Sequence, residues 1–168
     1  MRSKGLLSAL AVSAAITGGW LVPSIAAADI QGFLKIPGLP GESTNDQHPN
    51  EIELVSYTQN AGTNACFKAI VIKNLDRASP GLAVLAVTNQ VVTPVTVALV
   101  KSGGTPFEVF TAVLENVIVG TVELVEVDGG PLPTERVTLR PRRATLTYRT
   151  QSADGSPGTP VTTVVNCP

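Results

Sequence analysis

The sequence predicts a mainly β protein, an antiparallel β-barrel with one short α-helix. After residue 28, valine, threonine and isoleucine are abundant, and glycine and proline interrupt the chain at short intervals, which is typical of antiparallel folds. Several segments alternate polar and apolar side chains with the period of a strand, and only one stretch has helical spacing. We expect strands at residues 30–36, 51–58, 66–74, 92–101, 107–127, 136–150 and 160–167.

Two of these segments indicate which side chains face the core. In residues 51–54, the alternation points Ile52 and Leu54 inward and leaves the two glutamates, Glu51 and Glu53, facing water. The same period places a second set of apolar side chains on one face of their strand: Val95, Val97 and Leu99.

The predicted helix begins at Ser79 and ends before Asn89. Ser79 can cap it, and Pro80 follows at a position where a missing N–H costs nothing. The apolar residues at helical spacing are Leu82, Leu85 and Ala86. One short helix among many strands predicts a barrel that carries a single helical plug or flank.

The two longest strand segments, 107–127 and 136–150, form a predicted β-hairpin whose turn contains residues 128–131. The apolar positions of the second segment change parity, and Pro141 lies at the change. Because proline cannot donate to the strand ladder, we expect a β-bulge there.

The second segment of this hairpin is rich in arginine, as a phosphate-binding strip would be. These arginines are Arg136, Arg140, Arg142, Arg143 and Arg149. Glutamates on the facing segment favour a hairpin that neutralises its own charge, since opposite charges across a ladder stabilise it and fix its register. The expected pairs are Glu126 with Arg136, Glu123 with Arg140, and Glu115 with Arg149.

The first 28 residues have the layout of a secretory signal peptide. Arg2 and Lys4 precede an uncharged stretch that ends in three alanines at Ala28. An uncleaved membrane anchor is the competing interpretation, but Pro23 and two adjacent glycines weaken the far half of the stretch as a helix. We therefore expect cleavage after Ala28, one domain at residues 29–168 without a membrane span, and a secreted, periplasmic or cell-envelope location.

The cleaved chain is mildly acidic. Removing Arg2 and Lys4 from the 12 basic side chains leaves 10 against 13 acidic ones, a net charge of −3. This balance favours neither a nucleic-acid partner nor an anionic membrane surface. The two cysteines, Cys66 and Cys167, predict a disulfide in an exported protein. In the chain-entropy model, closing a loop of about a hundred residues stabilises a fold by roughly 4–5 kcal/mol.

The sequence predicts no catalytic, cofactor or metal site. His48 is the only histidine, and Ser43 with Asp46 could complete a hydrolase site in the same flexible loop. No nucleophile motif or oxyanion loop accompanies them, so a loop histidine with ordinary hydrogen bonds is the better interpretation. Glu51 and Glu53 lack the aromatic platforms of a sugar-cleaving site.

Several short motifs follow one another in an order that resembles the Hcp family (haemolysin-coregulated protein), the tube proteins of type VI secretion systems. Residues 33–36 resemble its F-I-K-I motif, residues 41–43 its G-E-S motif, and His48 and residues 51–52 its later histidine and E-I motif. Further downstream, two segments are similar to its strand-to-helix turn and final hairpin: residues 75–80 and 137–155.

The resemblance implies a non-enzymatic structural protein. Six copies would form a ring, and stacked rings would form a hollow tube that carries secreted effectors. The loop 37–50, with Gly41, Glu42, Ser43 and His48, would join successive rings, and the charged hairpin would contribute to contacts within a ring. The leader and the disulfide distinguish this chain as an exported Hcp-like variant. The alternative is a monomeric secreted module on the same barrel, which binds an effector or envelope protein.

Overall fold

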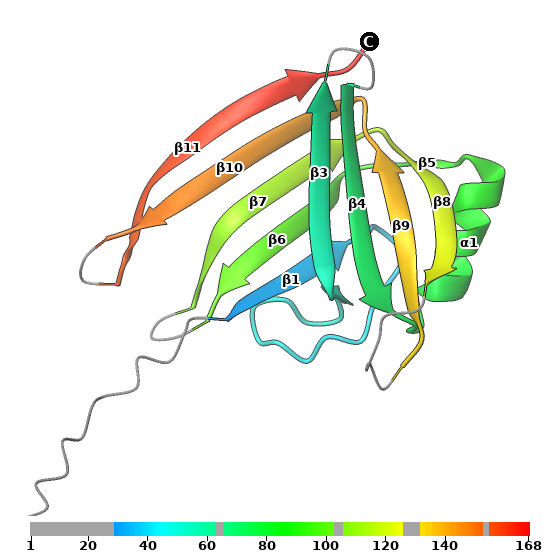
Figure 1. Ribbon diagram of the computed structural model, residues 1–168, viewed down its shortest axis with the longest axis horizontal. Coiled ribbons are helices and arrows are strands. Elements are labelled where there is room, and N and C mark those ends of the chain that lie inside the picture. Colours follow the sequence, from blue (N-terminus) through cyan, green and yellow to red (C-terminus); the bar gives the residue numbers. More distant parts are fainter. Residues whose placement is uncertain (1–28, 63–65, 103–105, 126–131, 153–154) are drawn as a thin grey trace, which may run out of the picture.

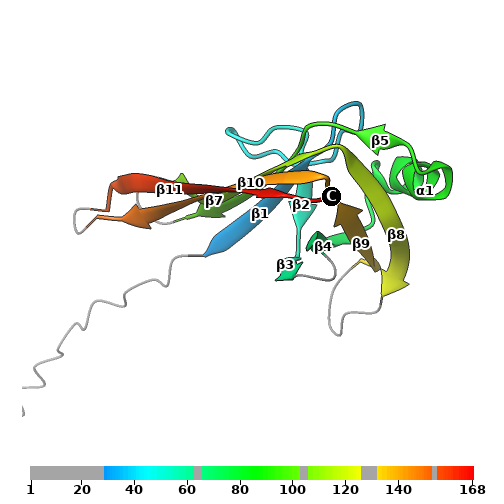
Figure 2. The same cartoon turned by 90° about the horizontal axis from the view of Figure 1, so that it is seen from above.

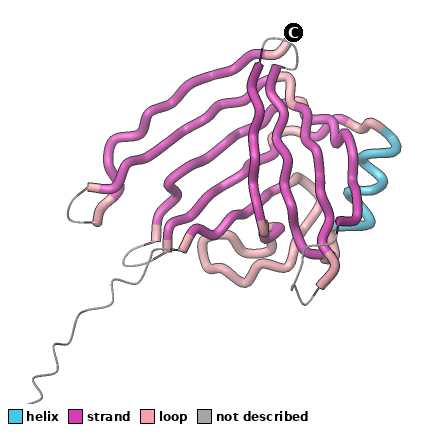
Figure 3. The backbone as a smooth tube through the Cα atoms, viewed as in Figure 1, coloured by secondary structure: helices cyan, strands magenta, loops and turns pink. Residues whose placement is uncertain are grey.

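The computed structural model describes residues 29–62, 66–102, 106–125, 132–152 and 155–168. These residues form two antiparallel β-sheets and one α-helix, α1 (Ser79–Thr88) (Figure 1, Figure 3). The prediction of a mainly β, antiparallel fold with one short helix is therefore confirmed. The predicted signal peptide, residues 1–28, lies outside the described residues.

The larger sheet has six strands in the order β11-β10-β7-β6-β1-β2, and the smaller has five in the order β3-β4-β9-β8-β5. The larger sheet contains β1 (Ile30–Lys35), β2 (Ile52–Leu54), β6 (Val95–Lys101), β7 (Phe107–Glu115), β10 (Arg143–Gln151) and β11 (Pro157–Asn166). The smaller contains β3 (Ser56–Gly62), β4 (Cys66–Asn74), β5 (Val91–Val92), β8 (Val117–Val125) and β9 (Thr134–Arg140). Each predicted strand segment coincides with one or two of these strands. In the described part of the chain, no ladder closes the two sheets into a continuous barrel.

Both long predicted strands bend where they pass from one sheet to the other. The first is divided at Asn116, whose φ of 51° lies in the left-handed region that asparagine tolerates. The second is divided at Pro141 and Arg142, between β9 and β10. The expected bulge at Pro141 is therefore a change of sheet, which a residue without an N–H accommodates because the ladder is interrupted there.

The hairpin pairing is confirmed, but its predicted register was wrong by three to six residues. Glu123 lies opposite Arg136, not Arg140. Glu115 lies opposite Arg143, not Arg149. Glu126 is outside the described residues. Buried apolar pairs set the observed register, namely Val119 with Leu139 and Val122 with Val137. Burial of these side chains outweighs the modest gain from exposed charge pairs.

One hydrophobic core lies between the sheets. Ile52 is fully buried in it and Leu54 packs against it, as predicted. Val95 and Val97 also belong to it, whereas Leu99 is only half-buried because a register irregularity follows it. Helix α1 packs along β8 and buries Leu82 and Leu85, again as its spacing predicted. Fully buried members from the other strands include Leu34, Val71, Leu114, Val117, Val119, Val137 and Leu139.

The helix begins and ends as predicted, but its N-terminal cap differs. Asn89 terminates it in a left-handed conformation. Ala78 is the N-cap residue and provides no side-chain cap, so the prediction that Ser79 caps the helix was wrong. Asp76 Oδ1 instead accepts a hydrogen bond from the backbone N–H of Ala78 at 2.9 Å. The hydroxyl of Ser79 donates to Glu135 Oε1 at 2.8 Å, which ties the start of the helix to β9.

A buried lysine completes this network. The side chain of Lys73, on β4, is 0% exposed, and its Nζ lies 2.8 Å from Glu135 Oε1 and 2.7 Å from Asp76 Oδ1. It also donates to Ser79 Oγ at 3.1 Å and to the carbonyl oxygen of Asn74 at 2.8 Å. The ammonium group thus donates to Asn74, Ser79 and Glu135, and Asp76 adds a second carboxylate, so the buried charge is neutralised and hydrogen-bonded.

Replacing Lys73 with methionine should destabilise the fold by about 3–5 kcal/mol, because Glu135 would remain buried without its cation. The double variant Lys73→Met/Glu135→Leu should recover a large part of this loss, since neither charge remains. Urea unfolding followed by circular dichroism measures both. A single variant as stable as the parent would show that the network contributes nothing.

Tyr57 links the two sheets through an aromatic contact. Its ring, on β3, is 5.9 Å from the ring of Phe110 on β7. Its hydroxyl donates to Gln59 Oε1 at 2.8 Å. Burial raises the pKa of the Tyr57 phenol well above its ordinary value near 10.

The neutral phenol should therefore be retained until the fold opens at alkaline pH. Below pH 10 both folded and unfolded states are neutral; above it the unfolded state ionises first, so stability falls as pH rises. In a Tyr148→Phe variant, Tyr57 is the only remaining tyrosine, and absorbance at 295 nm reports it alone. We expect phenolate absorbance to rise together with unfolding. A rise near pH 10 in a protein that remains folded would contradict the prediction.

Candidate interaction surfaces

A loop covers part of the outer face of the larger sheet. Three backbone hydrogen bonds close its base: Gly41 N–H to Asn50 O (2.8 Å), Asn50 N–H to Ser43 O (2.9 Å) and Ser43 N–H to Glu51 O (3.0 Å). A Cβ at Gly41 would lie 2.3 Å from the carbonyl oxygen of Glu51, so only glycine fits there. The segment is thus a braced structure, in contrast to the flexible loop that the sequence suggested.

His48 anchors this loop to the sheet. Its ring stacks on Phe33 with centroids 4.4 Å apart and planes 8° apart. His48 Nδ1 lies 3.1 Å from Glu51 Oε2, and Nε2 lies 3.7 Å from Glu108 Oε1. The histidine is buried, whereas the polar residues around it in the sequence had indicated an ordinary surface loop. Phe33 belongs to a second apolar layer, opposite the main core, whose other buried members include Ala98 and Val100.

The residues that could have formed a hydrolase site are not arranged as one. The polar neighbours of the His48 ring are Glu51 and Glu108. Ser43 Oγ instead accepts a hydrogen bond from the backbone N–H of Asn45 at 3.2 Å. Glu51, expected to face water, has a side chain only 13% exposed, because it lies against His48 at the start of β2. Glu53 is exposed, as expected.

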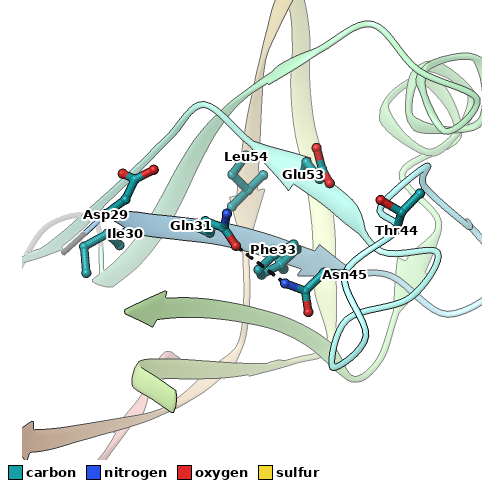
Figure 4. A pocket seen from close by; sticks show the side chains of 9 residues that line it. Asp29, Ile30, Gln31, Phe33, Thr44, Asn45, Glu53 and Leu54 are labelled. Atoms are coloured by element: carbon teal, nitrogen blue, oxygen red, sulfur yellow. Dashed lines mark hydrogen bonds between the residues drawn. The ribbon is translucent and has the colours of Figure 1, made fainter. Parts of the chain in front are cut away.

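A pocket of about 410 Å³ opens between this loop and β1–β2 (Figure 4). Asn45 Nδ2 donates to Gln31 Oε1 across it, at 3.5 Å. The charged residues of its lining are two carboxylates, Asp29 and Glu53. Together with exposed Asp46 on the loop, they make this end of the molecule acidic.

The opposite end carries the predicted disulfide. Cys66 begins β4, and Cys167 follows β11; their Cα atoms are 5.5 Å apart and their sulfur atoms are bonded. The bridge links the outermost strand of the larger sheet to the smaller sheet, which no ladder does. Beside it lies a depression of about 490 Å³ lined by Cys66, Phe67, Lys68, Asn116, Ile118, Arg140, Pro141, Arg142, Cys167 and Pro168.

The charged hairpin is partly neutralised. Arg143 Nη1 lies 2.9 Å from Glu115 Oε2, and Arg136 Nη1 lies 3.6 Å from Glu123 Oε2. Among the described residues, Arg140 forms no ion pair within 4 Å; it packs against Gly120, where a Cβ would lie 3.0 Å from its Nε. Arg149 is at the far end of β10, beside Gln47 and Glu108.

One end of the larger sheet extends beyond the smaller sheet. Figure 2 shows β7, β10 and β11 projecting from the body of the molecule. Large apolar side chains are exposed on this part: Tyr148 is 50% exposed, Val161 67% and Val164 43%. β11 is ten residues long, and in the described chain it pairs with β10 on one side only. Its valines were the sequence signal for this surface, but alternation alone does not reveal that a strand lies at an edge.

The described residues contain neither a cluster suited to a metal ion nor a helix suited to a membrane. No group of three or more histidine, cysteine, aspartate or glutamate side chains is arranged to hold a metal ion. No helix in the described ranges is both long and apolar enough to cross a membrane.

The chain is similar to proteins of type VI secretion. The family model described as "Type VI secretion system effector, Hcp" matches residues 33–148. Hcp1 from Salmonella typhimurium has a similar structure, with a TM-score of 0.71 and 27% identity over 82% of this chain and 94% of that protein. A type VI secretion system effector from Yersinia pestis has a TM-score of 0.68 and 22% identity over 80% of this chain and 98% of that one. Among curated proteins, no sequence match is found.

Replacing both cysteines with serine should lower the free energy of unfolding by about 4 kcal/mol, since the bridge spans 101 positions. Urea unfolding of the oxidised parent and of the Cys66→Ser/Cys167→Ser variant gives the difference. Adding a reductant to the parent should reproduce the loss, while the serine variant should be insensitive to it. Free thiols in the purified, unreduced protein would contradict the bridge.

Proposed function

The chain belongs to the Hcp family of type VI secretion system proteins, and on that premise we propose that it is a non-enzymatic structural protein whose copies assemble into six-membered rings. The observation that carries this proposal is the projecting end of the larger sheet, formed by β7, β10 and β11. A ten-residue edge strand with exposed valines is an open template for association. Closed rotational symmetry covers one such edge on every copy.

Contacts within the ring would use both faces of this projecting edge, since Val161 lies opposite Tyr148 on one face and Val164 lies opposite Thr145 on the other. Val161 and Val164 supply apolar area, and Tyr148 supplies an aromatic side chain of the kind enriched at interfaces. The charged hairpin would contribute polar contacts at the margin; its predicted members are Glu115, Glu123, Glu126, Arg136, Arg140 and Arg149. Its existing pairs, Glu115 with Arg143 and Glu123 with Arg136, neutralise two of its arginines and leave Arg140 and Arg149 to face a neighbour.

The braced loop would contact the next ring. Gly41, Ser43 and His48 are buried and hold the loop in shape. Glu42 is exposed and available to a partner, although Arg77 lies 3.7 Å from its carboxylate. In this interpretation the four predicted contact residues divide into three that shape the loop and one that touches the neighbour.

Export is part of the proposal. The leader at residues 1–28 would direct the chain out of the cytoplasm, and the Cys66–Cys167 bridge suits an oxidising compartment. The assembled protein would carry or contact a secreted effector or an envelope protein. The function then lies in surfaces, because the described polar clusters around Lys73 and His48 are buried and hold the fold together.

Size-exclusion chromatography with light scattering tests the ring. Residues 29–168 with the disulfide intact should have six times the mass of one copy. Val161→Glu/Val164→Glu should reduce the assembly to monomers with an unchanged circular dichroism spectrum, because two charges would be buried unpaired at the contact.

The matched control is Val87→Glu on helix α1, where the side chain is 83% exposed and remote from the projecting sheet. This variant should remain six-membered. A parent protein that is monomeric at high micromolar concentration would contradict the ring and favour the monomeric binding module.

A further inference from the structure

The disulfide lies in the wall of a basic depression. Cys66 and Cys167 both line it, and both are partly exposed. Three cationic side chains line it as well, namely Lys68 on β4, Arg140 at the end of β9 and Arg142 immediately before β10. The described lining contains no aspartate or glutamate. The bond between the two sulfur atoms is thus accessible from a positively charged recess of about 490 Å³.

Two of these cations lie side by side on the outer face of the smaller sheet. Ala69 pairs with Leu139, so the adjoining residues, Lys68 and Arg140, are neighbours on adjacent strands. Ala69 and Leu139 are fully buried, and strand alternation therefore turns both cations away from the core. Like charges at neighbouring positions of two strands repel each other. An anion held between them would relieve that repulsion.

The carboxylates on the neighbouring strands do not neutralise this pair. Strand β3, which flanks β4, contains no charged residue. On the other side, Glu115 is engaged with Arg143 at 2.9 Å, and Glu123 is engaged with Arg136 at 3.6 Å. Among the described residues, neither member of the pair has an ion-pair partner within 4 Å. The outer face beside the disulfide therefore keeps its positive charge.

The third cation joins the end of the chain to the start of β10. Arg142 Nη1 donates to the carbonyl oxygen of Pro168 at 3.0 Å, and the backbone N–H of Cys167 donates to the carbonyl oxygen of Arg142 at 2.7 Å. With a terminal carboxylate on Pro168, two positive charges would still remain in excess. Arg149 also forms no ion pair with a described residue, but it lies near the other end of β10 and does not line the depression.

We propose that this depression is a site of thiol–disulfide exchange, in which small anionic thiols are attracted to the Cys66–Cys167 bridge and reduce it. The thiolate of the ligand bonds to one Sγ, the Sγ–Sγ bond breaks, and its electron pair stays on the departing sulfur as a thiolate. A second ligand thiolate attacks the mixed disulfide and releases the other cysteine thiolate together with a ligand disulfide. The protein gains two electrons, and its two thiolates take protons from water.

The cations favour both stages of this exchange. They raise the local concentration of an anionic thiol, and positive charge beside a cysteine favours the thiolate that leaves. The fitting ligands are therefore thiols that carry further negative charge. Glutathione, a peptide thiol that also bears carboxylates, belongs to this class. The exchange needs one copy of the chain and does not depend on the ring.

Reduction would detach the last strand from the smaller sheet. No ladder joins β11 to that sheet in the described chain, so the bridge is its covalent tie. The bond would persist in the oxidising compartment of the proposed export and would be lost among the anionic thiols of a reducing one. The two hydrogen bonds at Arg142 would then be what holds the end of the chain.

Two reagents of similar size and different charge test the site. Mercaptoethanesulfonate carries one negative charge more than mercaptoethanol. With the oxidised protein at low salt, the rate of cysteine release per unit of reagent thiolate should be about tenfold higher for the sulfonate. At 1 M salt, where the Debye length is about 3 Å, this preference should disappear. Equal rates at low salt, or a bridge that resists both reagents in the folded protein, would overturn the proposal.

Variants show whether the named cations cause the preference. Lys68→Gln/Arg140→Gln should lower the ratio of the two rates to near one, whereas the matched control Lys68→Arg/Arg140→Lys keeps both charges and should keep the ratio of the parent. Lys101→Gln removes a positive charge at the far end of β6, opposite Phe107, and should also keep it. Because each ratio compares two reagents on the same variant, a change in exposure of the bridge cancels. A glutamine variant that retains the preference would refute the site.

The salt comparison on the parent protein needs no variant, so it decides the proposal even if the glutamine variant fails to fold.

Discussion

The bent ribbon formed by β7–β8 and β9–β10 is the constraint on which the remaining structure depends. Both of its long strands belong to both sheets, and β5–β6 passes between the sheets beside it, paired with β8 and β7. Its two bends lie side by side, at Asn116 and at Pro141–Arg142, and the backbone N–H of Arg142 donates to the carbonyl oxygen of Glu115 at 3.0 Å across them. One half of the ribbon covers the core beneath helix α1, and the other half projects as the larger sheet. The angle between the sheets, the core between them and the free strand edge therefore arise from the same two bends.

Sequence patterns predicted the elements well because strand period and proline or glycine breaks act locally. They located each strand segment, the helix and the disulfide, but could not show that four segments divide between two sheets, which depends on tertiary packing. The charge-based register was wrong because exposed pairs such as Glu123 with Arg136 contribute less than burial of Val119 and Leu139. Lys73 had a readable signal: it continues the inward-facing series of β4 after Val71. His48 had none, since its burial depends on stacking against Phe33 from a distant strand.

The polar residues of this fold divide by location into structural and contact groups. Lys73, Glu135, Asp76 and Ser79 satisfy one another beneath the helix. His48 and Glu51 brace the loop. Among the described residues, arginines without an ion-pair partner lie at both ends of the molecule: Arg140 and Arg142 beside the disulfide, and Arg149 beside Gln47 of the loop.

In the proposed export, the disulfide would impose an order of events. Cys66 and Cys167 are 101 positions apart, so in an exported chain the first thiol would emerge long before its partner. Oxidation can lock the fold only after the last strand has arrived, whereas β1, β2 and β3 precede Cys66 and lie outside the closed covalent loop. The bridge can therefore form only in a chain that includes the last strand. A chain truncated before Cys167 can collapse, but it cannot form the disulfide.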